Sequence, residues 1–136
     1  MRRVSFDTLL RKIKNIKFDN FDLIIGIGRG GIIPASIISY LLKKELRIVN
    51  IKFRDDDNKI IYKNPKITNK DNFKINNKIK NIKILLVDDV SRTGKTLEAA
   101  KGLFSGNRIK TFVINGNADY SLFDTKECLR LPWTRA

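Results

Sequence analysis

The chain has 136 residues, and its 28 lysines and arginines against 14 aspartates and glutamates leave a formal net charge of +14. Hydrophobic residues make up 42% of the chain, enough for the core of one domain spanning residues 1–136. The sequence has no histidine and one cysteine, which excludes histidine-based nucleophilic catalysis, histidine metal sites and a disulfide framework.

No stretch approaches the roughly 20 apolar residues of a membrane span, and the basic N-terminus lacks the continuous apolar core of a signal peptide. We therefore expect a soluble, cytoplasmic protein with no membrane partner.

The positive charge has two explanations: nucleic-acid binding, or a lysine-, asparagine- and isoleucine-rich composition combined with an anionic substrate. Basic residues are spread along the chain without an aromatic RNA-binding motif, which favours the second explanation.

Hydrophobic periodicity predicts the elements of the first half in chain order. A helix capped by Ser5 comes first, followed by a buried strand at residues 21–28 that stops at glycines. Residues 30–45 predict a second helix, and the β-branched residues of 46–53 predict a second strand. Residues 54–81 are polar and weakly patterned, so we expect a flexible loop that serves as a lid.

The second half continues the alternation of strands and helices. Residues 82–89 are the clearest predicted strand, because a continuous apolar run is typical of a parallel sheet covered on both faces. A helix at 94–104, a strand at 108–115 and a short strand near 126–131 follow. This order predicts an α/β fold: an open, mostly parallel twisted sheet with flanking helices. Ligands of such sheets bind at the carboxyl ends of the strands.

Two distinctive loops leave those strand ends, and each resembles a common phosphate-binding motif only in part. Gly94-Lys95-Thr96 ends one loop as in a P-loop, but that spacing puts Asp89, a carboxylate, where the first glycine should be. The other loop, residues 26–31, satisfies Gly-x-Gly-x-x-Gly, yet no acid ends the next strand as a dinucleotide site requires. Neither an NTPase nor a dinucleotide site accounts for both loops.

Together the two loops suit one ligand. The adjacent carboxylates of Asp88 and Asp89 suit vicinal ribose hydroxyls or Mg²⁺. Backbone N–H groups and hydroxyls of residues 91–96, at the start of a helix, suit a phosphate monoester. The glycines around Arg29 permit close backbone approach, and its guanidinium suits a second anion. The implied ligand is a ribose with a phosphate at one end and a charged leaving group at the other.

The stretch ILLVDDVSRTGKTL, residues 84–97, resembles the PRPP-binding motif of type I phosphoribosyltransferases. The stretch IIGIGRGGIIPAS, residues 24–36, resembles the pyrophosphate loop of small bacterial xanthine-guanine phosphoribosyltransferases. The resemblance implies the type I fold with a minimal hood. It also implies Mg²⁺-dependent transfer of phosphoribosyl from PRPP to a nucleobase, with a 6-oxopurine favoured, in purine salvage. The family is usually dimeric or tetrameric, so we expect a homo-oligomer.

The resemblance also implies the residues of the site. It assigns the ribose, Mg²⁺ and the catalytic role to Asp88 and Asp89. It assigns the 5′-phosphate to the loop residues Ser91, Arg92, Thr93, Gly94, Lys95 and Thr96. It assigns the pyrophosphate to Gly28, Arg29, Gly30 and Lys59, with a cis peptide expected between Gly28 and Arg29. Catalysis by orientation and electrostatics needs no protein nucleophile.

The chain departs from the family at the base site. Arg92 stands where the purine enzymes usually carry an acid for the N7 proton of the base, and arginine is no general base. No lysine is available for a 6-oxo group near residue 115; Asn115 and Asn117 are the candidates there. Cys128 or Leu129 stands at the place of the stacking aromatic residue.

Two alternatives follow from these departures and from the charge. One is a non-catalytic PRPP- or nucleotide-binding regulatory protein of the same fold, and the other is a basic nucleic-acid-binding protein. For Cys128 itself, the apolar context predicts a buried, inert thiol.

Overall fold

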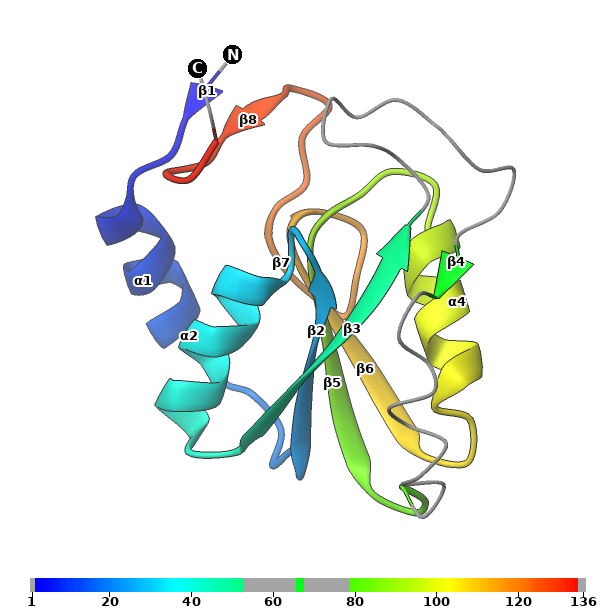
Figure 1. The fold of residues 1–136 in the computed structure, drawn as a ribbon. Coiled ribbons are helices and arrows are strands. Elements are labelled where there is room, and N and C mark those ends of the chain that lie inside the picture. Colours follow the sequence, from blue (N-terminus) through cyan, green and yellow to red (C-terminus); the bar gives the residue numbers. More distant parts are fainter. Residues whose placement is uncertain (1, 53–65, 68–78, 135–136) are drawn as a thin grey trace.

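The centre of the fold is a sheet of six strands in the computed structural model, which describes residues 2–52, 66–67 and 79–134 (Figure 1). Its strand order is β4-β3-β2-β5-β6-β7, and a separate two-stranded sheet pairs β1 with β8. The elements in chain order are β1 (Arg2–Arg3), α1 (Phe6–Lys14), β2 (Leu23–Gly28), α2 (Ile32–Leu42), β3 (Glu45–Lys52), β4 (Lys66–Ile67), β5 (Lys83–Ser91), α4 (Lys95–Leu103), β6 (Arg108–Gly116), β7 (Tyr120–Phe123) and β8 (Leu129–Arg130).

Five of the six strands, from β3 to β7 across the sheet, run parallel, and β4 pairs antiparallel with β3 at one edge. The carboxyl ends of the parallel strands therefore meet at one edge of the sheet. At that edge β5 lies between β2 and β6. The open, mostly parallel sheet expected from the sequence is confirmed.

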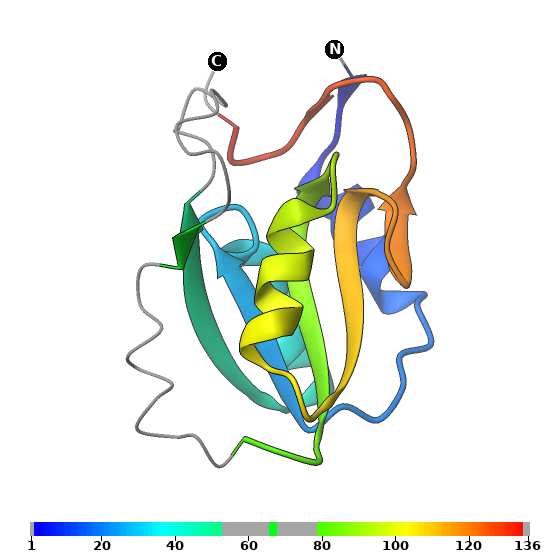
Figure 2. The same cartoon turned by 90° about the vertical axis from the view of Figure 1, so that its right-hand side faces the viewer.

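Helices cover both faces of the sheet: α1 and α2 lie on one face and α4 lies on the other (Figures 1 and 2). The apolar run of β5 serves both layers, since Leu85 and Val87 pack toward α1 and α2 whereas Ile84 and Leu86 pack toward α4. Burial on both faces is the reason why this strand is continuously apolar.

The predicted N-terminal helix is present and begins as expected. Ser5 is its N-cap, and the Ser5 hydroxyl accepts a hydrogen bond from the Thr8 N–H at 3.2 Å. Leu9 and Ile13 are buried on its inner side. The second helix is shorter than the predicted 30–45, because Lys43 takes a left-handed conformation (φ 55°) and ends it.

Strand β5 runs to Ser91, two residues past the predicted end, because Val90 and Ser91 continue the ladder with β6.

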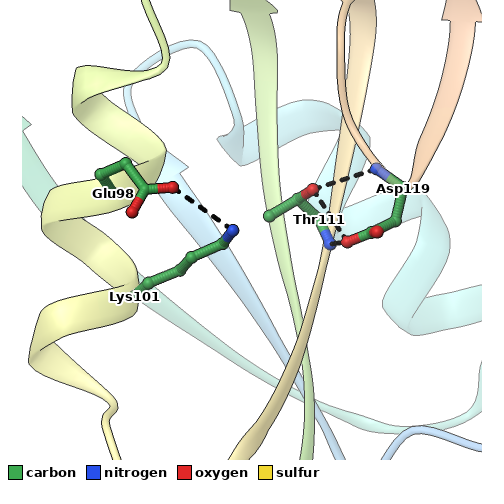
Figure 3. A network of polar contacts seen from close by, with 4 residues as sticks. All are labelled: Glu98, Lys101, Thr111 and Asp119. Carbon is green, nitrogen blue, oxygen red and sulfur yellow. Dashed lines mark hydrogen bonds and ion pairs between the residues drawn. The ribbon is translucent and has the colours of Figure 1, made fainter.

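Strand β7 was not predicted. The chain doubles back over residues 117–119, and Asp119 and Thr111 exchange hydrogen bonds of 2.8 to 3.2 Å that fix this return (Figure 3). On the outer side of α4, Lys101 pairs with Glu98 at 3.4 Å (Figure 3).

Strands β1 and β8 lie beyond the edge of the main sheet where β3 ends, so both chain ends meet there (Figure 1). Trp133 packs on Phe6 with ring centroids 5.9 Å apart, and Leu131 is buried in the core below.

The predicted loop 54–81 lies mostly outside the described residues, and so does Lys59. Within that range the structure describes the short strand β4 and residues 79–81. Of the described helices, none is both long and apolar enough to cross a membrane.

Candidate active site

The two adjacent carboxylates lie inside the last part of β5, with neighbouring strands on both sides. Asp88 is buried, with 8% of its surface exposed, and Asp89 is half-buried. The Asp89 N–H donates to Asp88 Oδ1 at 2.8 Å, and the Val90 N–H donates to Asp89 Oδ1 at 2.7 Å. These main-chain bonds hold both side chains in place at the carboxyl edge of the sheet.

Burial raises the pKa of Asp88 well above its ordinary value of 3.8, and the neighbouring charge of Asp89 raises it further. Both effects oppose a second negative charge at the same point. Asp88 therefore retains its proton to a higher pH than an isolated aspartate would. A ligand that brings positive charge or hydroxyl donors to this point relieves both effects.

The Asp88→Asn variant should be more stable than the native protein at neutral pH. The folded state binds a proton at Asp88 more tightly than the unfolded chain, so stability falls as the pH rises from about 3.8 to the raised pKa and stays lower above it. Asparagine keeps the acceptor for the Asp89 N–H without the charge. We expect a gain on the order of 1 kcal/mol, the usual size of a buried substitution. Urea unfolding at about pH 7 and about pH 4 measures it, and an equal gain at both pH values would contradict this account.

The predicted phosphate cradle, residues 91–96, connects β5 to α4. Gly94 is the N-cap of α4 at φ 78°, a left-handed conformation that favours glycine. It offers no side-chain cap, so a ligand can reach the amides of the first turn. The Thr93 hydroxyl accepts from the Lys95 N–H at 3.3 Å. Arg92, Thr93 and Lys95 are exposed, which leaves this loop accessible to an anion.

The predicted pyrophosphate loop connects β2 to α2 across residues 28–31. The Gly28–Arg29 peptide bond is cis, as the resemblance to phosphoribosyltransferases implies. The turn is closed by the Gly31 N–H, which donates to the Ile27 carbonyl at 2.8 Å, and by the Ile32 N–H, which donates to the Arg29 carbonyl at 3.1 Å. Arg29 is exposed at the tip of the loop.

The two loops are in direct contact. A methyl group on Gly30 would overlap the carboxylate of Asp89, so the backbone of one loop rests on the acid pair of the other. Residues about 60 positions apart in sequence thus form one continuous surface. The order across it is pyrophosphate loop, acid pair and phosphate cradle, which is the order of groups along the ligand that the sequence implies.

Sequence reasoning missed Asn50. Its side chain lies where a methyl group on Gly28 would be, and the two residues are partners in the β2–β3 register. A polar residue within an otherwise apolar strand end was the available signal. Asn50 therefore belongs to the support of the pyrophosphate loop.

The four predicted base-site residues have different surroundings. Asn115 is buried, with its amide group bonded to the main chain of Thr125 and Glu127. Asn117 is exposed. Leu129 packs on the core from β8. The prediction that Cys128 is buried is wrong: its thiol is exposed, because the strand after it pairs with β1 outside the main core.

The acid pair fits Mg²⁺ by its chemistry. Mg²⁺ binds oxygen ligands and commonly takes only one or two carboxylates, with water and substrate oxygens completing its shell. The described residues contain no cluster of three or more acidic, cysteine or histidine side chains. A metal at Asp88 and Asp89 would therefore share its ligands with a bound substrate.

Comparison with known proteins gives consistent results. Residues 5–130 match the family model of the phosphoribosyl transferase domain. The fold superposes on a purine phosphoribosyltransferase from Pyrococcus horikoshii with a TM-score of 0.75 at 27% identity, covering 100% of this chain and 96% of that one. It also superposes on a xanthine-guanine-hypoxanthine phosphoribosyltransferase from Helicobacter pylori, with a TM-score of 0.69, 19% identity, and coverage of 98% and 92%.

A curated orotate phosphoribosyltransferase from Sulfurisphaera tokodaii is 38% identical over 94 residues, which is 69% of this chain and 42% of that protein. The chain thus spans less than half the length of this relative. The family match extends across β2, β5 and β6 and includes both loops that meet at Asp89. The chain therefore belongs to the phosphoribosyl transferase domain family and has its type I fold.

Proposed function

We propose that this protein transfers the 5-phosphoribosyl group from PRPP to a 6-oxopurine (xanthine, guanine or hypoxanthine) and releases pyrophosphate. The observation that carries the proposal is the contact between Gly30 and the Asp89 carboxylate. It brings two loops that suit anions together at an acid pair that suits the hydroxyls of a ribose between them. Membership of the phosphoribosyl transferase domain family supports it.

In this proposal the chain binds and orients the substrate. The ribose hydroxyls donate to Asp88 and Asp89, residues 91–96 bind the 5′-phosphate, and the loop of Gly28, Arg29 and Gly30 binds the pyrophosphate. Asp88 and Asp89 would also hold Mg²⁺, through water or the ribose hydroxyls, and the ion would neutralise charge on the leaving group. A ring nitrogen of the base attacks C1′ with inversion as pyrophosphate departs. Orientation and electrostatics supply the rate, so no nucleophilic residue is required.

The choice of acceptor rests on a likeness in length and fold. The purine enzyme from Pyrococcus horikoshii matches this chain over its whole length, which supports a purine acceptor. Orotate is the second candidate, since the orotate enzyme shares 38% identity with 69% of this chain. The exposed guanidinium of Arg92 also suits a carboxylated base.

A cytoplasmic homo-oligomer remains part of the proposal, and light scattering of the purified protein tests the oligomer.

One experiment separates the candidates. Mg²⁺-PRPP is titrated into the protein by calorimetry, and pyrophosphate release is then followed with xanthine, guanine, hypoxanthine and orotate. Turnover with a 6-oxopurine supports the proposal, and turnover with orotate alone supports the second candidate. Binding without turnover supports a regulatory PRPP- or nucleotide-binding protein. Absence of PRPP binding, with salt-dependent binding of DNA or RNA, would favour the nucleic-acid alternative.

Arg92→Asp tests the base chemistry directly. Arginine cannot accept a proton near neutral pH, whereas aspartate can accept the one that leaves the purine. General-base catalysis contributes ~10²- to 10⁴-fold, and we expect at least roughly a tenfold rise in kcat with guanine or xanthine. Arg92→Asn is the control, because it removes the same cation without adding a base. Equal rates for the two variants would show that position 92 takes no part in proton transfer.

A further inference from the structure

The side-chain amide of Asn115 is bonded to the main chain of the protein, whereas a ligand-binding residue would present its polar atoms to the ligand. It lies near the end of β6 with 6% of its surface exposed. Its Nδ2 donates to the carbonyl of Thr125 at 3.1 Å and to that of Glu127 at 3.5 Å, and its Oδ1 accepts from the Thr125 N–H at 3.0 Å. Both ends of the amide are therefore bonded to the chain that connects β7 to β8. We call this connection, residues 124–128, the 124–128 segment.

The 124–128 segment is stiffened by a further bond. The Glu127 N–H donates to the Thr125 hydroxyl at 3.1 Å. The segment ends at the exposed Cys128 and continues directly into Leu129 of β8. The main chain of Asn115 is the register partner of Phe123 in β7, and its side chain ties the 124–128 segment, which follows β7, to the end of β6.

Asn115 ties this segment to the part of β6 that lies next to the end of β5. Asn115 is the register partner of Val90, the residue that follows Asp89. The pyrophosphate loop comes from β2, and β2 and β6 lie on opposite sides of β5. A displacement with inversion requires the nucleophile to enter opposite the leaving group. If pyrophosphate leaves on the β2 side, the acceptor enters from the β6 side.

We infer that Asn115 is a positioning residue that holds the 124–128 segment as the acceptor-binding wall, so that the base is recognised by this segment and not by the Asn115 side chain. The inference rests on the proposed function, because it assumes transfer to an acceptor. It assigns to Asn115 a role different from the direct contact with the base that the sequence suggests. The acceptor here is a planar heterocycle that can bond with main-chain groups.

The chain contains a matched control at the other end of the same strand. Asn107, directly before β6, donates from Nδ2 to the carbonyls of Ile79 and Phe104, each at 2.9 Å, and accepts from the Ile82 N–H at 3.2 Å. It therefore has the same pattern of one accepted and two donated main-chain bonds. At about 3.3 Å per residue it lies roughly 26 Å from Asn115 along the strand.

The test compares Asn115→Asp with Asn107→Asp. In each variant a carboxylate oxygen replaces the NH₂ group and faces two carbonyl oxygens, so both variants lose the donated bonds. For Asn115→Asp we expect the KM for the acceptor base to rise at least roughly tenfold, as displacement of a positioning element does. The Kd for Mg²⁺-PRPP should stay within about twofold. Asn107→Asp should lower stability and leave both constants unchanged.

The outcomes are distinguishable from failure of the proposed function. Hydrogen exchange of the free proteins needs no substrate: the amides of residues 124–129 should exchange faster in Asn115→Asp than in either the native protein or Asn107→Asp. Unchanged exchange overturns the inference even if the native protein transfers phosphoribosyl groups. An acceptor KM that moves equally in both variants, or a loss confined to PRPP binding, also overturns it. If Asn115→Asp does not fold, Thr125→Val carries the test, because it removes the bond to the Glu127 N–H and should raise the same KM.

Discussion

Replacing Asp89 with asparagine is expected to lower kcat/KM for PRPP by roughly 10²- to 10³-fold, the loss found when one preorganised polar group of an active site is removed. The Asp89 carboxylate lies under the Gly30 backbone, and its Oδ1 is bonded to the Val90 N–H. Asparagine can keep that bond and has the same shape, so the fold should persist. It lacks the negative charge that suits ribose hydroxyls and Mg²⁺.

The matched control is Asp22→Asn, at the residue directly before β2, where the carboxylate contacts the opposite end of β5. The Asp22 carboxylate accepts from the Lys83 N–H at 2.9 Å, which is a main-chain bond of the same kind at the first residue of β5. Steady-state kinetics with PRPP and the preferred base should show a large loss for Asp89→Asn and a change of less than about twofold for Asp22→Asn. Similar rates for Asp89→Asn and the native protein would mean that the ribose does not bind at this pair.

Gly30→Ala should weaken binding of Mg²⁺-PRPP by roughly 10- to 100-fold. The added methyl group would overlap the Asp89 carboxylate, so either that side chain or the pyrophosphate loop must move. Overpacking of this kind costs ~1–3 kcal/mol, and ~1.4 kcal/mol corresponds to a tenfold change in affinity. Because the loop and the acid pair are proposed to bind the same ligand, displacement of either one disturbs a contact to PRPP. Calorimetric titration measures the affinity.

Gly102→Ala is the control for Gly30→Ala. Gly102 lies in α4, and within the described part of the chain a methyl group there would meet no atom within 4 Å apart from its sequence neighbours and the backbone of its own helix. Alanine in a helix is favoured over glycine by ~0.5–1 kcal/mol, so this variant should be slightly more stable and should bind PRPP normally. If Gly30→Ala also binds PRPP normally, the contact between the two loops has no part in binding.

Much of the fold could be predicted because its signals are local. A glycine-terminated apolar run predicted β2, a continuous apolar run predicted β5, and Ser5 predicted the start of α1, all within a few residues of the observed bounds. Each of these signals depends on neighbours along the chain. The short strand predicted near 126–131 is present as β8. Its partner β1 has only two residues and pairs with it across more than 120 positions, so no local pattern could reveal β1 or this pairing.

The candidate site also has a part that local sequence patterns could predict and a part that depends on the tertiary structure. The sequence alone indicated the acid pair, the glycine loop and the phosphate cradle, because each is a short motif whose residue types carry its chemistry. That Gly30 rests on Asp89 follows from the pairing of β2 with β5, which is a property of strand order.

The acceptor side was the least predictable part. The sequence suggested that Asn115 contacts a base and that Cys128 is buried, but Asn115 bonds to the chain at Thr125, and Cys128 is exposed. Both results depend on where the 124–128 segment crosses the end of the sheet. The sequence by itself thus determined which groups are available for a ribose with two phosphate-bearing ends. The tertiary structure decided which of them meet and which are used within the fold, because strand order and register bring together residues that no local pattern connects.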